Sequence, residues 1–254
     1  MYRAIIADVD GTLIPAGEYP LRPPSKRLTQ AVAEAFDKKV FFSLATARSL
    51  FSIEPFINNL HLSAPIILDN GAVVHDCLTH TDIERIYLSK NDAQWVLALC
   101  KQYPQLHVAL VDKGKRIEDA TQITAWQITK IVLRHHLLHQ TAKIYSQLSK
   151  NLHIHVTRSV AQTNPMRESL HITDRTATKE SGVKKIAHFI GCKTQQIIGI
   201  GDSDNDIGLL RACGLKVAVG NATPKIKALA DFIAPSAQND AVAQVIEKYI
   251  TRPE

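Results

Sequence analysis

The sequence predicts an α/β protein built on an open parallel sheet, with a smaller α+β domain inserted in the middle of the chain. Two observations support this prediction. Short apolar runs that stop at polar or glycine-containing loops alternate with helical patterns at both ends of the chain. Between about residues 75 and 165 the pattern changes to segments in which apolar and polar residues alternate, which is typical of strands with one open face.

The N-terminal part predicts a strand-helix-strand unit. The apolar run at residues 2–7 stops at Asp8-Val9-Asp10-Gly11-Thr12, as a buried strand does at a polar turn. A helical spacing of apolar residues follows, with Ser25 as its N-cap. Strands joined by helices favour parallel pairing. The expected elements are a helix at 25–38 and further strands at 40–45 and 65–68.

The same alternation returns in the C-terminal part. We expect Ser181 to be the N-cap of a helix, with Lys179 two residues ahead of it. Pro224 suits the first turn of another helix. The expected elements are helices at 181–190, 207–213 and 223–230, and strands at 196–200 and 216–219.

The middle of the chain predicts a separate α+β unit. Its expected elements are helices at 91–103 and 141–148, and strands at 106–111, 128–133 and 152–157. The predicted division is therefore a catalytic core formed by 1–74 and 166–254, with an inserted domain at 75–165.

Composition limits the function classes. Of 254 residues, 45% are hydrophobic and 21% charged, which is typical of a soluble globular protein. The net charge is +6, but basic residues are spread along the chain without a Lys/Arg run, so a nucleic-acid partner is not expected. No apolar stretch suits a membrane helix, and we expect a cytoplasmic protein with four free, mostly buried cysteines. These are Cys77, Cys100, Cys192 and Cys213.

Polar residues gather at the carboxyl ends of the predicted parallel strands. In an open α/β sheet this edge is where ligands bind, so residues far apart in the sequence can meet in one pocket. The clusters are Asp8 with Asp10, Thr46, and Asp202 with Asp206.

The Asp8-x-Asp10 pair predicts a site in which carboxylates bind a metal ion or react with the substrate. Carboxylates are oxygen ligands that suit Mg²⁺, and a carboxylate can also be a covalent nucleophile while a second one moves a proton. Gly11 would let the backbone approach a phosphate closely. The alternative is a turn capped by aspartates.

The segment Asp202-Ser203-Asp204-Asn205-Asp206 is similar to a calcium loop but does not match one. Ile207 stands where the loop requires glycine, and Cys213 stands where it requires glutamate. A magnesium site that shares its ion with a substrate phosphate fits better. The alternative is an aspartate-rich helix cap.

Two further residues could hold a phosphate. Thr46 with Arg48 could supply a hydroxyl and a cation, and Lys179 could supply an ammonium group. The alternatives are that Thr46 only caps a helix and that Lys179 is solvated.

These motifs, in this order, resemble the haloacid dehalogenase superfamily, and in particular its phosphatases with the larger C2-type cap. The resemblance covers the segments 1–74 and 166–254 and implies a Rossmann-like core with an inserted cap domain. The motifs are ADVDGTL, LATAR, LDNGA, KESGVKKIAHFIG, GDSDNDIGLL and VAVGNATPKIKALA.

The resemblance also implies roles for individual residues. Asp8 would attack phosphorus and Asp10 would be the acid and base. Mg²⁺ would be held by Asp8, Asp202, Asp206 and the main-chain carbonyl of Asp10. The phosphate would be held by Gly11, Thr46, Ala47, Lys179 and Asn205, and the pocket would be lined by Arg48, Asn70, Gly71 and Asn221.

Three positions depart from the family's pattern. Ala47 and Ala241 stand where glycine is usual, and Glu180 follows Lys179 where a glycine is common. None of these changes removes a catalytic group, but each bears on loop geometry and substrate range.

Several alternatives stay open for the whole protein. The expected function is hydrolysis of a small phosphorylated metabolite, such as a sugar phosphate or phosphoglycolate, by a monomer or homodimer. A phosphomutase or phosphotransferase on the same fold, or a non-enzymatic binding protein, are the others. We expect Trp95 and Trp126 to be core residues. The cap histidines, expected at the surface, are His107, His135, His136, His139, His153 and His155.

Overall fold

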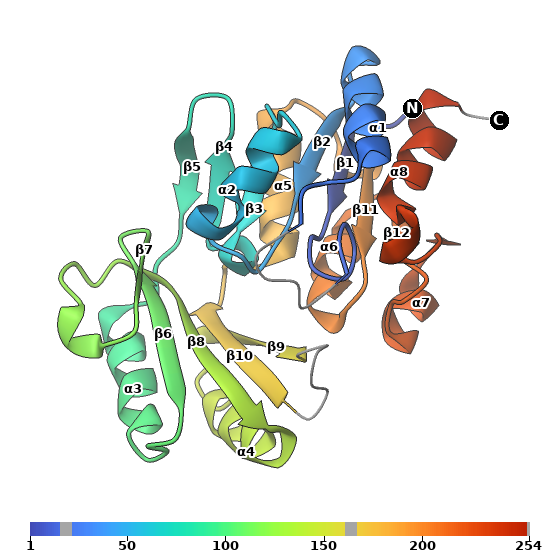
Figure 1. Ribbon diagram of the computed structural model, residues 1–254. Coiled ribbons are helices and arrows are strands. Elements are labelled where there is room, and N and C mark those ends of the chain that lie inside the picture. Colours follow the sequence, from blue (N-terminus) through green and yellow to red (C-terminus); the bar gives the residue numbers. More distant parts are fainter. Residues whose placement is uncertain (16–21, 161–166, 253–254) are drawn as a thin grey trace.

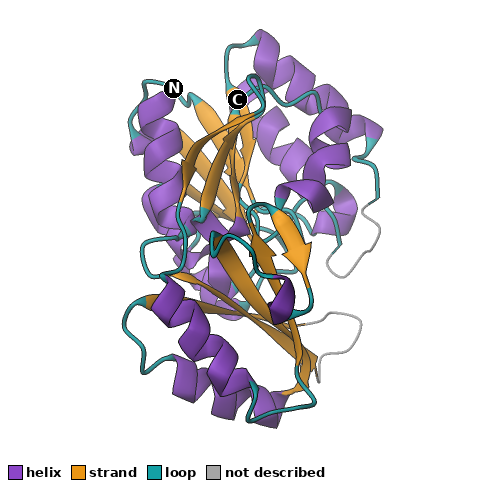
Figure 2. Ribbon diagram, turned by 90° about the vertical axis from the view of Figure 1, so that its left-hand side faces the viewer, coloured by secondary structure: helices purple, strands orange, loops and turns teal. Residues whose placement is uncertain are grey.

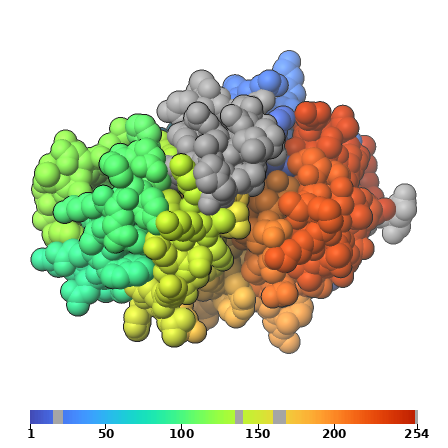
Figure 3. Space-filling view, turned by 90° about the horizontal axis from the view of Figure 1, so that it is seen from below, coloured from blue at the N-terminus to red at the C-terminus, as the bar shows by residue number. Residues whose placement is uncertain are grey.

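The computed structural model describes residues 1–15, 22–160 and 167–252. It has two parts, a larger α/β core that contains both chain ends and a smaller α+β part, called the cap here (Figure 1). Seen from below, the cap in green and yellow lies beside the C-terminal part of the core in orange and red (Figure 3).

A five-stranded sheet forms the centre of the core, and all of its neighbouring strands are parallel. The predicted α/β fold class is therefore confirmed. The first strand is buried along its whole length, which agrees with its uninterrupted apolar sequence. In spatial order the strands are β13 (Phe232–Ile233), β12 (Leu215–Ala218), β11 (Ile197–Gly201), β1 (Ala4–Ala7) and β2 (Phe41–Leu44).

Helices cover both faces of this sheet (Figure 2). Ser25 caps the first helix through a 3.0 Å bond from the backbone N–H of Leu28, as predicted. The fifth helix corrects a prediction, because Thr178 and not Ser181 is its N-cap; the two side chains form a reciprocal capping box, and Lys179 is the first helical residue. The core helices are α1 (Lys26–Asp37), α2 (Leu50–Asn59), α5 (Lys179–Phe189), α6 (Ile207–Ala212), α7 (Pro224–Leu229) and α8 (Ala241–Ile246), the last continued by a π-helical turn at Glu247–Thr251.

The predicted strand at 65–68 is present at the edge of the core. It meets the central sheet through an isolated parallel bridge between Ala45 and Ile67 and pairs antiparallel on its other side. The resulting small sheet contains β3 (Pro65–Leu68), β4 (Val73–Asp76) and β5 (Thr81–Arg85). Short 3₁₀ turns occupy Asp69–Gly71, Ala120–Gln122, Thr194–Gln196, Asp204–Asp206 and Ala237–Asn239.

The cap is an antiparallel sheet with two helices. The helices pack on one face of this sheet and form a separate hydrophobic cluster with it. The strands are, in spatial order, β7 (Lys115–Ile117), β6 (His107–Asp112), β8 (Ile128–Leu137), β10 (Arg167–Asp174) and β9 (Ile154–Val160), and the helices are α3 (Lys90–Cys100) and α4 (Leu138–Leu148).

Packing bears on the predicted domain boundaries. Cys77 belongs to the hydrophobic cluster of the core, whereas Leu170 and Ile172 belong to that of the cap. Strand β10 therefore packs with the cap, although the predicted division at 165/166 assigned it to the core. We propose boundaries near residues 86 and 174, where the chain passes between the two clusters.

Other predictions concern single side chains and the membrane. Cys77, Cys100 and Cys213 are buried and Cys192 is half-buried, and all four are free. Trp95 is exposed and not a core residue, because its helix position faces solvent. Among the described residues, no helix combines the length and apolar character needed to span a membrane. The side chains of His135, His136 and His139 lie outside the described residues.

Candidate active site

The topology of the central sheet brings the two aspartate motifs together. From β1 the chain first moves outward to β2, and it later returns to β11 on the other side of β1. The strand order therefore reverses between β1 and β11, which is where open α/β sheets form a ligand-binding crevice. Asp8 follows β1 and Asp202 follows β11, and the backbone N–H of Asp8 donates to the carbonyl of Ile200 at 2.9 Å.

Three carboxylates and one ammonium group form the centre of this site. Carboxylate oxygens of Asp8, Asp202 and Asp206 lie within 4.8 Å of one another, and all three residues are buried. The Nζ of Lys179 donates to Oδ1 of Asp8 at 2.8 Å and to Oδ1 of Asp206 at 2.6 Å. One buried positive charge thus stands against three buried acids.

The pKa values reflect this excess of acid. Burial raises the pKa of Asp8 well above its ordinary value, and the neighbouring Asp206 raises it further. Burial and Asp206 likewise raise the pKa of Asp202 to about 7. For Lys179, burial lowers the pKa, but Asp206 and Asp8 outweigh it, and the net pKa is raised. Lys179 therefore stays charged while the acids compete for protons.

The backbone at Gly11 lies very close to the Asp202 carboxylate. Gly11 has φ +87°, and a Cβ on it would lie 2.3 Å from Oδ2 of Asp202. The Thr12 hydroxyl donates to Oδ1 of Asp202 at 3.1 Å. Oδ2 of Asp206 accepts from the backbone N–H groups of Asp202 and Ser203, both at 3.1 Å. These contacts fix the acids before any ligand arrives.

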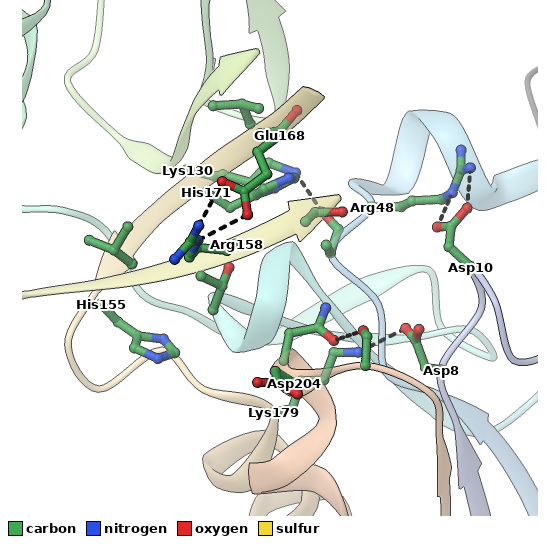
Figure 4. Close-up of a pocket in the computed structure, with 18 of the residues that line it drawn as sticks. Asp8, Asp10, Arg48, Lys130, His155, Arg158, Glu168, His171, Lys179 and Asp204 are labelled. Atoms are coloured by element: carbon green, nitrogen blue, oxygen red, sulfur yellow. Dashed lines mark hydrogen bonds and ion pairs between the residues drawn. The ribbon is translucent and has the colours of Figure 1, made fainter. Parts of the chain in front are cut away.

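The second aspartate of the first motif has a different environment. Asp10 is half-buried, and its two carboxylate oxygens accept from Nε and Nη2 of Arg48 at 2.7 and 2.6 Å (Figure 4). Arg48 lies in the loop after β2, called the 46–49 loop here (Thr46, Ala47, Arg48, Ser49). The Thr46 hydroxyl is buried and accepts from the backbone N–H of Arg48 at 3.1 Å.

Of the predicted asparagines, two line the cavity, whereas Asn70 and Gly71 contact other parts of the protein. Asn205 and Asn221 line the cavity, and the Asn221 amide bridges the carbonyl of Gly11 at 2.8 Å and the N–H of Ala237 at 2.9 Å. Asn70 instead donates to the Thr157 hydroxyl of the cap at 3.0 Å. Gly71 packs on α5, where a Cβ would lie 2.2 Å from the Thr178 carbonyl.

A cavity of about 1550 Å³ lies between the acids and the cap, and the open face of the cap sheet forms its other wall. The cap residues include Lys130, Arg134, His155 and His171, which sequence reasoning did not assign to the site. Nδ1 of His155 and Nδ1 of His171 are buried without a hydrogen-bond partner, and burial with two nearby cations lowers the pKa of His171 to about 3. His155 was expected at the surface, and the structure corrects this by placing it in the cavity wall. Sequence did not show which strand residues face the cavity, because that depends on strand register.

The acid cluster fits a magnesium ion. Mg²⁺ prefers oxygen ligands and is usually held by a few carboxylates together with substrate oxygens. Asp8, Asp202 and Asp206 supply these ligands, and a divalent cation would offset the charge that raises the pKa values of Asp8 and Asp202.

Comparisons with known proteins support this description. The model of the haloacid dehalogenase-like hydrolases matches residues 5–127 and 114–246. A relative named as a 5-amino-6-(5-phospho-D-ribitylamino)uracil phosphatase from Bacillus subtilis is 28% identical, over 98% of this chain and 96% of its own. A haloacid dehalogenase-like hydrolase structure from B. subtilis superposes with TM-score 0.83 at 16% identity, covering 98% of this chain and all of the other. A subclass IIB sugar phosphatase superposes with TM-score 0.77 at 17% identity, covering 96% and 98%.

Proposed function

This chain belongs to the haloacid dehalogenase-like hydrolase family and is a phosphatase, and from this premise we propose that it hydrolyses small phosphate monoesters with Mg²⁺ through an aspartyl-phosphate on Asp8. The observation that carries the proposal is the buried cluster of Asp8, Asp202, Asp206 and Lys179 at the floor of a cavity. A protein that only binds phosphate has no need for three buried carboxylates beside an anion.

In the first proposed step, an oxygen of Asp8 bonds to phosphorus and the bond from phosphorus to the leaving oxygen breaks. Asp10, in its protonated form, gives its proton to that oxygen. In the second step, water bonds to phosphorus, its proton passes to the Asp10 carboxylate, and the bond to Asp8 breaks. Phosphate leaves and both aspartates return to their starting states.

The remaining groups neutralise and orient charge, which is the main requirement of phosphoryl transfer. Lys179 holds an Asp8 oxygen in place and would face the phosphoryl oxygens from the same side. The Thr46 hydroxyl, the Ala47 backbone and Asn205 are proposed phosphate contacts. Mg²⁺, held by Asp8, Asp202, Asp206 and the Asp10 carbonyl, would supply charge neutralisation when bound.

The cavity supports a substrate larger than phosphate alone. Its volume and the mixture of Arg134, His155 and His171 on its cap wall suit a polar leaving group with hydrogen-bonding groups. Sugar phosphates and phosphoglycolate stay candidates, and the ribitylaminouracil phosphate named for the B. subtilis relative joins them. We propose a small phosphorylated metabolite of the cytoplasm as the substrate.

Phosphate release from a panel of these compounds, with and without Mg²⁺, tests the proposal. We expect metal-dependent release by the wild type, and a loss of at least about a thousandfold in Asp8→Asn with the fold intact by circular dichroism. Comparable turnover by pure Asp8→Asn would refute the nucleophile assignment. Isomerisation that needs a bisphosphate activator and retains phosphate would instead identify a mutase.

A further inference from the structure

A second buried carboxylate, that of Asp69, lies outside the acid cluster at a contact between the cap and the core. Oδ1 of Asp69 lies 2.8 Å from Nζ of Lys130, and Oδ2 accepts from the Thr129 hydroxyl at 2.8 Å. Both partners belong to the cap, and the core contributes a hydrogen bond from the Ser49 hydroxyl to Oδ1. All four residues are buried, with Lys130 only 5% exposed. We call these four residues the Asp69 seat.

A β-bulge in the cap sheet allows Thr129 and Lys130 to contact Asp69 together. Val111 of β6 pairs with Lys130, but the next residue, Asp112, pairs with Ile128. Thr129 is therefore an extra residue in β8, and the two strands form a β-bulge at this point. Such a bulge lets two successive side chains point the same way. Ile128 packs in the hydrophobic cluster of the cap, whereas Thr129 and Lys130 both turn toward the core.

Lys130 also binds the loop that carries Arg48. Its Nζ donates to the Ala47 carbonyl at 2.7 Å and to the Ser49 hydroxyl at 3.2 Å, on either side of Arg48. The backbone N–H of Asp69 donates to the Arg48 carbonyl at 3.0 Å. One cap ammonium group thus holds the loop at the residues before and after the arginine.

The position of Arg48 affects Asp10, the proposed acid and base. Arg48 holds both oxygens of Asp10, and Asp10 has to exchange a proton with the leaving group and with water. A displacement of Arg48 therefore changes the placement and the charge environment of Asp10. The loop also carries Thr46 and Ala47, which are proposed phosphate contacts.

We propose that Lys130 is a positioning residue: seated on Asp69, it fixes the 46–49 loop and through Arg48 sets the Asp10 carboxylate. The inference rests on the proposed function for its kinetic consequence but not for its structural one. In this arrangement the docked cap does more than cover the cavity, because it supplies a contact that the catalytic loop needs.

The kinetic test compares Lys130→Met with Lys115→Met, a matched control on the exposed edge strand β7 of the same cap. On the best substrate of the panel we expect kcat to fall at least tenfold in Lys130→Met and to stay unchanged in Lys115→Met. The double variant with Arg48→Met should be at most threefold slower than Arg48→Met alone, because both changes disturb one element. Multiplicative effects, or full kcat in Lys130→Met, would overturn the inference while leaving the phosphatase proposal intact if Asp8→Asn is inactive.

A second measurement needs no turnover. Hydrogen exchange of the Asp69 and Asn70 amides, which donate to the carbonyls of Arg48 and Thr46, reports the order of the loop. We expect exchange to accelerate at least tenfold in Lys130→Met, with the amides of β1 unchanged, and no change in Lys115→Met. Unchanged exchange at Asp69 and Asn70 in folded Lys130→Met would overturn the inference even if no substrate were found.

Discussion

The acid cluster and the Asp69 seat are built from the same kinds of groups but differ in charge balance. Each has a buried lysine in contact with a buried aspartate that follows a strand of the core. At the Asp69 seat one lysine meets one acid, and two hydroxyl groups complete the hydrogen bonds. At the acid cluster one lysine meets three acids, and the pKa values of Asp8 and Asp202 are raised.

The difference separates a structural pair from a site prepared for a ligand. A balanced buried pair has no electrostatic reason to change. An excess of buried negative charge costs stability until a cation or proton offsets it. Binding of a cation at the acid cluster is therefore favoured, because it removes this cost. Raised pKa values among acids thus identify the reactive site more specifically than burial or ion pairing does.

The same chemical change should have opposite effects at the two sites, and this is the largest effect that we expect on stability. Asp69→Asn removes the acid that is paired with buried Lys130 and should lower the free energy of unfolding by about 3 kcal/mol or more. Asp202→Asn removes an excess charge and should raise it by about 1–3 kcal/mol in metal-free protein at pH 8. Urea unfolding of both variants with chelator checks this. Destabilisation of similar size in both would remove the distinction.

The pH dependence of stability sharpens the comparison further. Between about pH 4 and 7, folded Asp202 keeps its proton whereas in the unfolded chain it is ionised, so the folded state binds more protons and metal-free stability falls as pH rises. The expected slope from this residue is up to about 1.4 kcal/mol per pH unit. It should disappear in Asp202→Asn and persist in Asp69→Asn. Mg²⁺ should stabilise the wild type more at pH 8 than at pH 5, and an equal shift in melting temperature at both values would contradict this account.

The smallest expected effect comes from a matched pair of threonines. Thr129→Val removes the hydroxyl that donates to Asp69, and Thr12→Val removes the one that donates to Asp202. Each should lower the free energy of unfolding by about 1–2 kcal/mol without metal. With saturating Mg²⁺ the cost should stay the same at Thr129 and shrink at Thr12, because a cation then satisfies Asp202. If Mg²⁺ changed the loss of unfolding free energy equally in both variants, the proposed difference between the acid cluster and the Asp69 seat would be wrong.

Sequence reasoning located the acid cluster because its residues are set by local rules. Asp8 and Asp202 each end an apolar strand run, and neighbouring parallel strands bring such ends together whatever lies between them. The fold class followed from the same runs. The N-cap of α5 was misplaced by three residues, because the capping box of Thr178 and Ser181 has serine where the usual sequence signature has glutamate or glutamine.

The cap side of the cavity could not be found in this way. Lys130 reads as an ordinary strand lysine, and Asp69 reads as a turn residue beside the predicted Asn70. Their contact depends on a bulge one residue away and on the docking of two sheets. Neither leaves a pattern in the spacing of one sequence. His171 was missed for the same reason, since strand register decides which face it joins.

The extra residue in β8 has a consequence for protein engineering. Removing Thr129 would leave a regular ladder in which Ile128 and Lys130 still alternate correctly, so a chimera with a shortened strand should fold its cap and pass a structural check. It would nonetheless have lost one of the two cap donors to Asp69. When caps are exchanged between related enzymes to obtain new specificities, the bulge has to travel with the cap, and the recipient core has to offer an aspartate to receive it.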